Sequence, residues 1–145
     1  MKATLIAALV LAGALSAEAP KPGSVTFIES SRVADAFVKG RPLVEIENYK
    51  VHASHRDGPG MVEIHERDTD IVYVLDGTTT LVTGGEAIDA KTTAPEELRG
   101  VSIRGGSERR LSKGDVIIIP NGVPHWFKEV PGPLNYYVVK VRSEK

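Results

Sequence analysis

The residues with the clearest chemical potential are two of the four histidines and the carboxylates near them. Glu63 and His65 lie two positions apart in a segment that predicts a strand, so both side chains point to one face. Asp70 opens the next predicted strand and can return to the same face, and His125 opens a later strand. Imidazole nitrogens and carboxylate oxygens that converge inside a β-barrel suit Mn, Fe, Co, Ni or Zn. The chain has no cysteine, which excludes a thiolate metal site and a thiol nucleophile.

The elements that must position these residues are mainly short strands between Gly- and Pro-containing turns. Apolar residues at helical spacing predict one short helix, which Ser30 or Ser31 caps and Gly40 ends. Alternating or continuous apolar runs predict strands at residues 43–54, 61–66, 70–75, 78–82, 116–119, 124–129 and 134–141. Many short strands with one helix predict an all-β barrel or jelly roll.

Three features of this pattern lead to specific expectations. Asp76-Gly77 between two apolar runs is the strongest hairpin signal in the chain. Val116–Ile119 is a continuous β-branched run, which is typical of a buried strand. The less regular residues 84–113 form either a functional lid or an extra hairpin that covers one end of the barrel, and the pattern favours neither.

The spacing of glycines, proline and histidine near the end of the chain resembles a motif of the cupin family. The second cupin motif has Gly, Pro, Gly and His at fixed intervals, and Gly114, Pro120, Gly122 and His125 match all of them. Glu129 stands where the family usually has Asn.

The first cupin motif is matched less completely. Its second His is His65, Asp70 takes the place of its Glu, and Gly77 closes it. Glu63 replaces its first His, and its leading Gly is displaced by one position to Gly58. The resemblance covers about residues 43–142.

The resemblance implies an all-β double-stranded β-helix, the cupin jelly-roll barrel, with a pocket at its mouth and the short N-terminal helix added. Carried over residue by residue, the family's metal ligands correspond to Glu63, His65, Asp70 and His125. Because Asp is one methylene shorter than Glu, the site must shift or lose that ligand. The resemblance also implies a homodimer.

Simpler roles remain open for the same side chains. His65 and His125 could be pocket histidines without a metal, satisfied by hydrogen bonds. Glu63 could form a structural ion pair with His65, and Asp70 could belong to a surface turn.

Other candidate residues lie outside this set. His52 and His55 are three positions apart on a predicted strand and face opposite sides, so His52 could point toward the site while His55 points away. Glu129, or a carboxylate released from the metal, is the candidate for acid–base catalysis.

Three functions fit these observations. The first is a divalent-metal enzyme that acts on a small polar molecule, of the oxygenase, isomerase or lyase type, and the fold does not choose among these reactions. The alternative is a non-catalytic cupin that binds a small molecule or carbohydrate without metal. The third is a structural dimerisation domain that uses exposed β-branched strands and Trp126.

Composition and the N-terminal residues bear on partners and location. A formal net charge of −1 provides no electrostatic case for nucleic-acid binding.

The first residues follow the order of a secretory signal, with Lys2, then an apolar stretch at residues 3–15 and then small residues, and cleavage is expected after Ser16 or Ala17. The apolar stretch is shorter than the roughly 20 residues of a membrane span. We therefore expect residues 1–17 to be removed, residues 18–42 to form a leader with the helix, and residues 43–142 to form the barrel. The mature chain, with no membrane span, is expected to be secreted or periplasmic.

Overall fold

The computed structural model describes residue 21 and residues 23–144. The signal expected at residues 1–17 lies outside the described residues. Within the described part, no helix has the length and apolar character needed to cross a membrane.

The helix α1 (Ser30–Lys39) lies where its apolar spacing predicts it. The predicted serine cap is wrong, because Ser30 is already helical and Glu29 occupies the capping position without a side-chain hydrogen bond. Gly40 ends the helix at a φ of 59°, a left-handed conformation that glycine adopts without strain. Phe37 contacts Tyr137 edge-on, with ring centroids 5.0 Å apart, so α1 packs on the outer face of the barrel.

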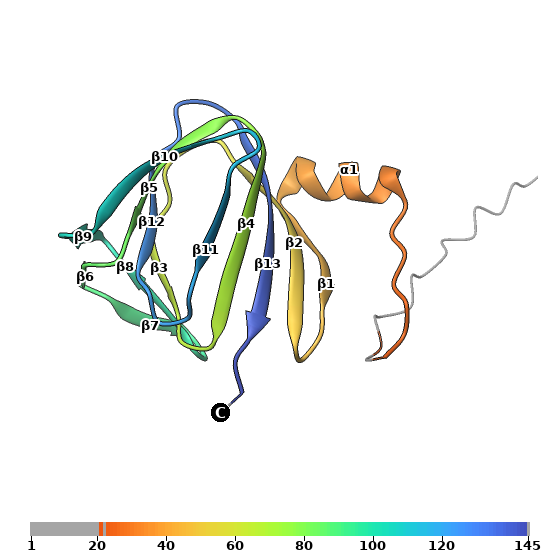
Figure 1. Ribbon diagram of the computed structural model, residues 1–145, viewed down its shortest axis with the longest axis horizontal. Helices are drawn as coiled ribbons and strands as arrows, with labels where there is room; N and C mark the ends of the chain where they lie inside the picture. Colours follow the sequence, from red (N-terminus) through yellow and green to blue (C-terminus); the bar gives the residue numbers. More distant parts are fainter. Residues whose placement is uncertain (1–20, 22, 145) are drawn as a thin grey trace, which may run out of the picture.

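Two antiparallel sheets face each other and form the barrel (Figure 1). The first has the order β1-β2-β13-β4-β11 and comprises β1 (Arg41–Glu45), β2 (Tyr49–Arg56), β4 (Asp68–Asp76), β11 (Val116–Ile119) and β13 (Leu134–Arg142). The second has the order β10-β5-β12-β3-β8-β7 and comprises β3 (Val62–His65), β5 (Thr78–Thr83), β7 (Lys91–Ala94), β8 (Glu97–Gly100), β10 (Ser107–Ser112) and β12 (His125–Glu129). The strands β6 (Glu86–Ile88) and β9 (Ser102–Arg104) form a small separate sheet. The arrangement confirms the all-β barrel with one short helix in the described residues.

The space between the sheets is apolar at one end and polar at the other. On β4 every second residue is buried, in the order Asp68, Asp70, Val72 and Val74. The two valines belong to the main hydrophobic cluster, whose buried members are Val72, Val74, Leu81, Leu111, Ile119, Phe127, Val130, Leu134, Tyr136 and Val138. The same strand face therefore passes from the apolar core to buried carboxylates.

The hairpin predicted at Asp76-Gly77 is wrong. The strand before it, β4, pairs with β13 and β11, whereas the strand after it, β5, pairs with β10 and β12 in the other sheet. The chain therefore changes sheets at Gly77. This residue has a φ of 86°, and a Cβ there would lie 2.3 Å from the Pro133 carbonyl oxygen. Glycine is needed here because the chain turns from one sheet to the other at a positive φ, a conformation that a hairpin turn also requires.

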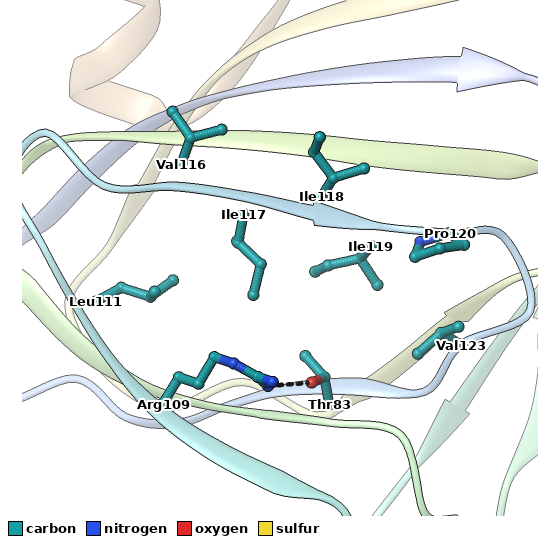
Figure 2. A pocket seen from close by; sticks show the side chains of 9 residues that line it. All are labelled: Thr83, Arg109, Leu111, Val116, Ile117, Ile118, Ile119, Pro120 and Val123. Atoms are coloured by element: carbon teal, nitrogen blue, oxygen red, sulfur yellow. Dashed lines mark hydrogen bonds between the residues drawn. The ribbon is translucent and has the colours of Figure 1, made fainter.

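The strand β11 lies at a sheet edge with one face exposed, so the prediction that Val116–Ile119 is wholly buried is wrong. Val116 and Ile118 are 59% and 62% exposed. Figure 2 shows Ile117 and Ile119 on the opposite side, pointing into a cleft between β10 and β11. The edge position leaves one face of the β-branched run without a covering layer.

Two other segments contain more strands than their sequence patterns predict. Residues 43–54 span the end of β1 and most of β2, which pair as a hairpin. Within residues 84–113, β7 and β8 also form a hairpin, and β8 pairs with β3 in the second sheet. The extra-hairpin alternative is therefore present in this region, and β8 brings Arg99 beside the candidate site.

Candidate metal centre

The strands β3 and β12 bring three ligand-type side chains together. Glu63 and His65 lie on β3, and His125 opens β12 directly opposite Glu63 in the strand register. One donor atom from each residue lies within 4.8 Å of the other two. The Glu63 Oε2 atom lies 3.6 Å from His65 Nε2 and 4.0 Å from His125 Nε2. These three residues form a group that could hold a metal ion.

His125 is oriented as a metal ligand requires. It is 2% exposed, and its Nδ1 atom lies 3.1 Å from the Val123 carbonyl oxygen. A proton on Nδ1 donates to that carbonyl and leaves the Nε2 lone pair facing Glu63. Burial lowers the pKa of His125 and keeps the imidazole neutral, the form that binds metals.

Two arginines hold Glu63 by one carboxylate oxygen. Its Oε1 atom accepts a hydrogen bond from Arg56 and forms an ion pair with Arg99, each at 2.8 Å, which leaves Oε2 facing the histidines. Burial opposes ionisation, but the neighbouring His65, 3.6 Å from Oε2, and the charges of the two arginines hold the pKa of Glu63 far below its ordinary value of 4.5. Glu63 is therefore ionised and oriented, with one oxygen free for a cation.

Asp70 faces the same space but is bound to a lysine. Lys140 Nζ donates to both Asp70 carboxylate oxygens at 2.8 Å and also lies 2.8 Å from His65 Nε2. Asp70 Oδ2 is 3.5 Å from His65 Nε2 and 3.8 Å from His125 Nε2. Asp70 nevertheless stands outside the group of three mutually close donors. Its role as a ligand stays a prediction, and the structure assigns its oxygens a different partner.

The protonation of His65 depends on Lys140. Burial lowers the pKa of His65, but the carboxylates of Asp70 and Glu63, 3.5 and 3.6 Å from its Nε2 atom, outweigh burial and raise the pKa to about 9. The 2.8 Å contact between His65 Nε2 and Lys140 Nζ requires one of the two nitrogens to accept. His65 can accept from the Lys140 ammonium only through an unprotonated Nε2, so this contact opposes the protonation that the two carboxylates favour. A metal ion on His65 Nε2 would have to replace this contact.

All these side chains line one cavity of about 360 Å³ between the sheets. A cavity of this size accepts a small molecule. Its remaining lining combines polar and apolar side chains, including His52, Ser54, Glu97, Phe127, Tyr136 and Val138. Polar side chains near the three donors and apolar side chains beside the core give the cavity the lining of a small-molecule binding site.

The two remaining histidines face opposite sides of β2, as their spacing predicts. His52 lines the cavity and its Nε2 atom lies 3.0 Å from Glu45. His55 lies outside it, with Nδ1 2.7 Å from Asn135 Oδ1 and Nε2 3.1 Å from Asp57. His55 is therefore no candidate ligand.

The structure does not bring Glu129 to the cavity. The strand β12 begins at the cavity with His125 and runs away from it, so Glu129 lies roughly 13 Å further along the strand. There its carboxylate accepts a hydrogen bond from the Thr80 hydroxyl at 2.7 Å and lines a separate surface cleft. The acid–base role predicted for Glu129 has no support from its position.

Three cationic residues of the cavity escaped the sequence analysis: Arg56, Arg99 and Lys140. One signal could have identified Lys140, because the alternation that buries Tyr136 and Val138 places Lys140 next on the inward face of β13. Arg99 carries no such signal, since its contact with Glu63 depends on the pairing of β8 with β3.

Comparison with known proteins agrees with this architecture. A crystal structure from Bacillus halodurans has a TM-score of 0.56 and 15% identity, over 86% of this chain and 86% of that chain. An RmlC-like cupin family protein with a double-stranded β-helix fold, from Methanocaldococcus jannaschii, has a TM-score of 0.50 and 12% identity, over 71% and 78%. KdgF from Halomonas sp. has a TM-score of 0.50 and 17% identity, over 72% and 79%. Identities this low show a shared fold alone.

A search of the curated proteins returns no match. The family model described as Cupin matches residues 21–143, which is most of the chain. The double-stranded β-helix expected from the two motifs is confirmed by the paired sheets and by the Methanocaldococcus jannaschii protein. The chain belongs to the cupin family.

Proposed function

We propose that this cupin binds one divalent transition metal ion through Glu63, His65 and His125 and acts on a small polar molecule in the adjacent cavity. The observation that carries the proposal is the convergence of one ionised carboxylate oxygen and two imidazole nitrogens. Neighbouring ligand atoms around an ion with bonds of about 2.1 Å lie roughly 3.0 to 3.4 Å apart. The observed 3.6 and 4.0 Å therefore need only a small closure. Two histidines and one carboxylate, with other positions open, form a donor set that iron and related metals accept.

The residues of the chain would orient both the ion and its ligand. Arg56 and Arg99 keep Oε2 of Glu63 turned inward, and the Val123 carbonyl keeps Nε2 of His125 unprotonated. A bound metal would supply a Lewis acid that polarises an oxygen of the ligand. These properties support an oxygenase, isomerase or lyase, and the chemistry of the bound small molecule determines which of these reactions takes place.

The charges of the cavity favour a ligand rich in oxygen atoms. Three cationic and three anionic side chains line it and cancel formally: Arg56, Arg99 and Lys140 against Glu63, Asp70 and Glu97. A divalent ion would leave a net positive charge, which acceptor oxygens of a small polar molecule offset.

One observation favours a second candidate, a cupin that binds a small polar molecule or carbohydrate without metal. The Lys140 ammonium contacts His65 Nε2 and both Asp70 oxygens at 2.8 Å. In that arrangement a cation of the chain itself neutralises the Asp70 carboxylate and occupies His65 Nε2.

Metal content distinguishes the two candidates. The purified protein is exposed in turn to Mn, Fe, Co, Ni and Zn, and bound metal is measured by elemental analysis. We expect about one equivalent in the wild type and its loss in His65→Ala and His125→Ala. His55→Ala, which removes a histidine outside the cavity, is the control and should retain the metal. A folded wild-type protein that retains none of these ions would overturn the metal proposal and favour the second candidate.

We further propose that the mature protein works outside the cytoplasm. The order of a positive charge at Lys2, an apolar stretch and small residues supports a cleaved signal. N-terminal sequencing of the exported protein should begin just after Ser16 or Ala17. An exported chain that still begins at Met1 would contradict cleavage.

A further inference from the structure

We infer that Lys140 keeps Asp70 out of the coordination sphere of the metal, so that the site offers three protein ligands instead of four. The inference rests on the proposed metal site at Glu63, His65 and His125. Lys140 is a positioning residue in this inference, because it acts through Asp70 and not on the bound molecule.

The contact between Lys140 and Asp70 engages both carboxylate oxygens. Nζ lies 2.8 Å from each of them, so each oxygen that could ligate a metal already accepts a charged hydrogen bond. The side chains of Lys140 and Asp70 are 12% and 7% exposed. Water therefore competes little for either group, and releasing Asp70 would leave a buried ammonium without its anion.

The strand register fixes this contact. Lys140 lies directly opposite Asp70 in the pairing of β13 with β4. The alternation of burial on β4 turns Asp70 inward, and the same alternation on β13 follows Tyr136 and Val138 to Lys140. Lys140 and Asp70 are thus directly opposed residues of opposite charge on neighbouring strands, and the backbone pairing brings their side chains together.

Asp70 is near enough to act as a ligand once it is released. Its Oδ2 atom lies 3.5 and 3.8 Å from the Nε2 atoms of His65 and His125, which is as near as Glu63 Oε2 lies to them. Distance alone therefore does not exclude Asp70. The Lys140 charge does, because a metal on His65 Nε2 displaces one contact with an imidazole, whereas a metal on Asp70 would have to separate the ammonium from both oxygens of its anion. The position that Asp70 would fill stays open for a small molecule.

A second lysine–aspartate pair on the same sheet provides a matched control. Lys50 lies opposite Lys140 in the pairing of β2 with β13, and its Nζ atom contacts Asp68 at 2.8 Å. Neither Lys50 nor Asp68 lines the cavity. Replacing Lys50 therefore removes a lysine–aspartate pair of the same sheet, at a more exposed position, without freeing a carboxylate at the site.

The test is a titration of the full chain with Co²⁺, with affinity measured by calorimetry and coordination number by the visible absorption of the bound ion. Methionine in Lys140→Met keeps the length of the side chain and removes its charge. We expect this variant to bind Co²⁺ about tenfold more tightly, because Lys140 no longer contacts His65 and Asp70, and to change the spectrum, because Asp70 becomes a fourth protein ligand. The double variant Lys140→Met/Asp70→Asn should return to the wild-type spectrum, and Lys50→Met should keep both wild-type values.

The possible failures are distinguishable. A folded Lys140→Met protein with the wild-type affinity and spectrum overturns the inference and leaves the metal site standing. A spectrum that changes in Asp70→Asn alone also overturns it, because Asp70 would then be a ligand in the wild type. A wild-type protein that binds no Co²⁺ overturns the proposed metal site itself. Circular dichroism of each variant confirms that it is folded.

Discussion

Replacing Glu63 by alanine should destabilise the metal-free protein, because two arginines would lose their shared partner. The Glu63 side chain is 13% exposed, and its Oε1 atom contacts Arg56 and Arg99 at 2.8 Å each. Removing one partner of a buried ion pair costs about 3–5 kcal/mol, since an uncompensated charge stays behind.

The surroundings of the two arginines reduce this cost. Arg56 keeps the Tyr136 hydroxyl at 3.0 Å and the face of the Phe127 ring at 4.4 Å. Arg99 is 31% exposed and keeps its ion pair with Glu97. We therefore expect a loss of about 2–3 kcal/mol in the free energy of unfolding. At roughly 4 °C per kcal/mol for a domain of this size, the melting temperature should fall by about 10 °C.

Urea unfolding followed by the fluorescence of Trp126 measures this loss. Trp126 is the one tryptophan of the chain, and its indole N–H donates to the Gly60 carbonyl at 2.8 Å, so its signal reports on the integrity of β12. Glu97→Ala is the matched control, because it removes a carboxylate that serves one partly exposed arginine and should cost less than about 1 kcal/mol. Equal losses in Glu63→Ala and Glu97→Ala, or an unchanged urea midpoint in Glu63→Ala, would refute the reasoning.

Four further changes have expected outcomes. Gly77→Ala should cost about 2–4 kcal/mol by calorimetry, because the Cβ meets a backbone carbonyl at positive φ, and a wild-type melting temperature would contradict this. Burial opposes ionisation of Asp68, but its paired cations hold its pKa below 3.8. The stability that the ionised Asp68 contributes is therefore complete above about pH 4 and is lost as the pH falls further. In Asp68→Asn, the urea midpoint of unfolding should fall less steeply with decreasing pH than in the wild type. Glu129→Gln should leave metal content unchanged and stability within about 0.5 kcal/mol, and a loss of metal would restore a role for Glu129 at the site. The homodimer stays a prediction: the exposed apolar face of edge strand β11 is its expected interface, so Ile118→Glu should yield a monomer by light scattering, and a monomeric wild type would refute it.

Local pattern was sufficient for several features of this protein. The period of two along a strand predicts that Glu63 and His65 share a face, and the structure confirms it. The spacing of Gly114, Pro120, Gly122 and His125 predicted the family and the second histidine of the site. These predictions succeed because they depend on residues close together in the chain.

Predictions that needed the neighbours of a strand were the ones that failed. Asp76-Gly77 has the residue types of a hairpin, yet the same backbone freedom allows a corner between sheets, and the pairing of β4 with β13 decided between them. The β-branched run of β11 does not reveal whether its strand lies at the centre or the edge of a sheet. Glu129 follows His125 closely in sequence, but the direction of β12 carries it out of the cavity.

The all-β class, the cupin motifs and the ligand types that face the barrel interior therefore follow from local patterns in the sequence. The charges that those ligands meet depend on the tertiary structure. Lys140 is 70 residues from Asp70 in the chain and opposite it in the sheet, and Arg99 reaches Glu63 because β8 pairs with β3. Strand order and register are set by packing across the whole barrel, so contacts of this kind have no local signature.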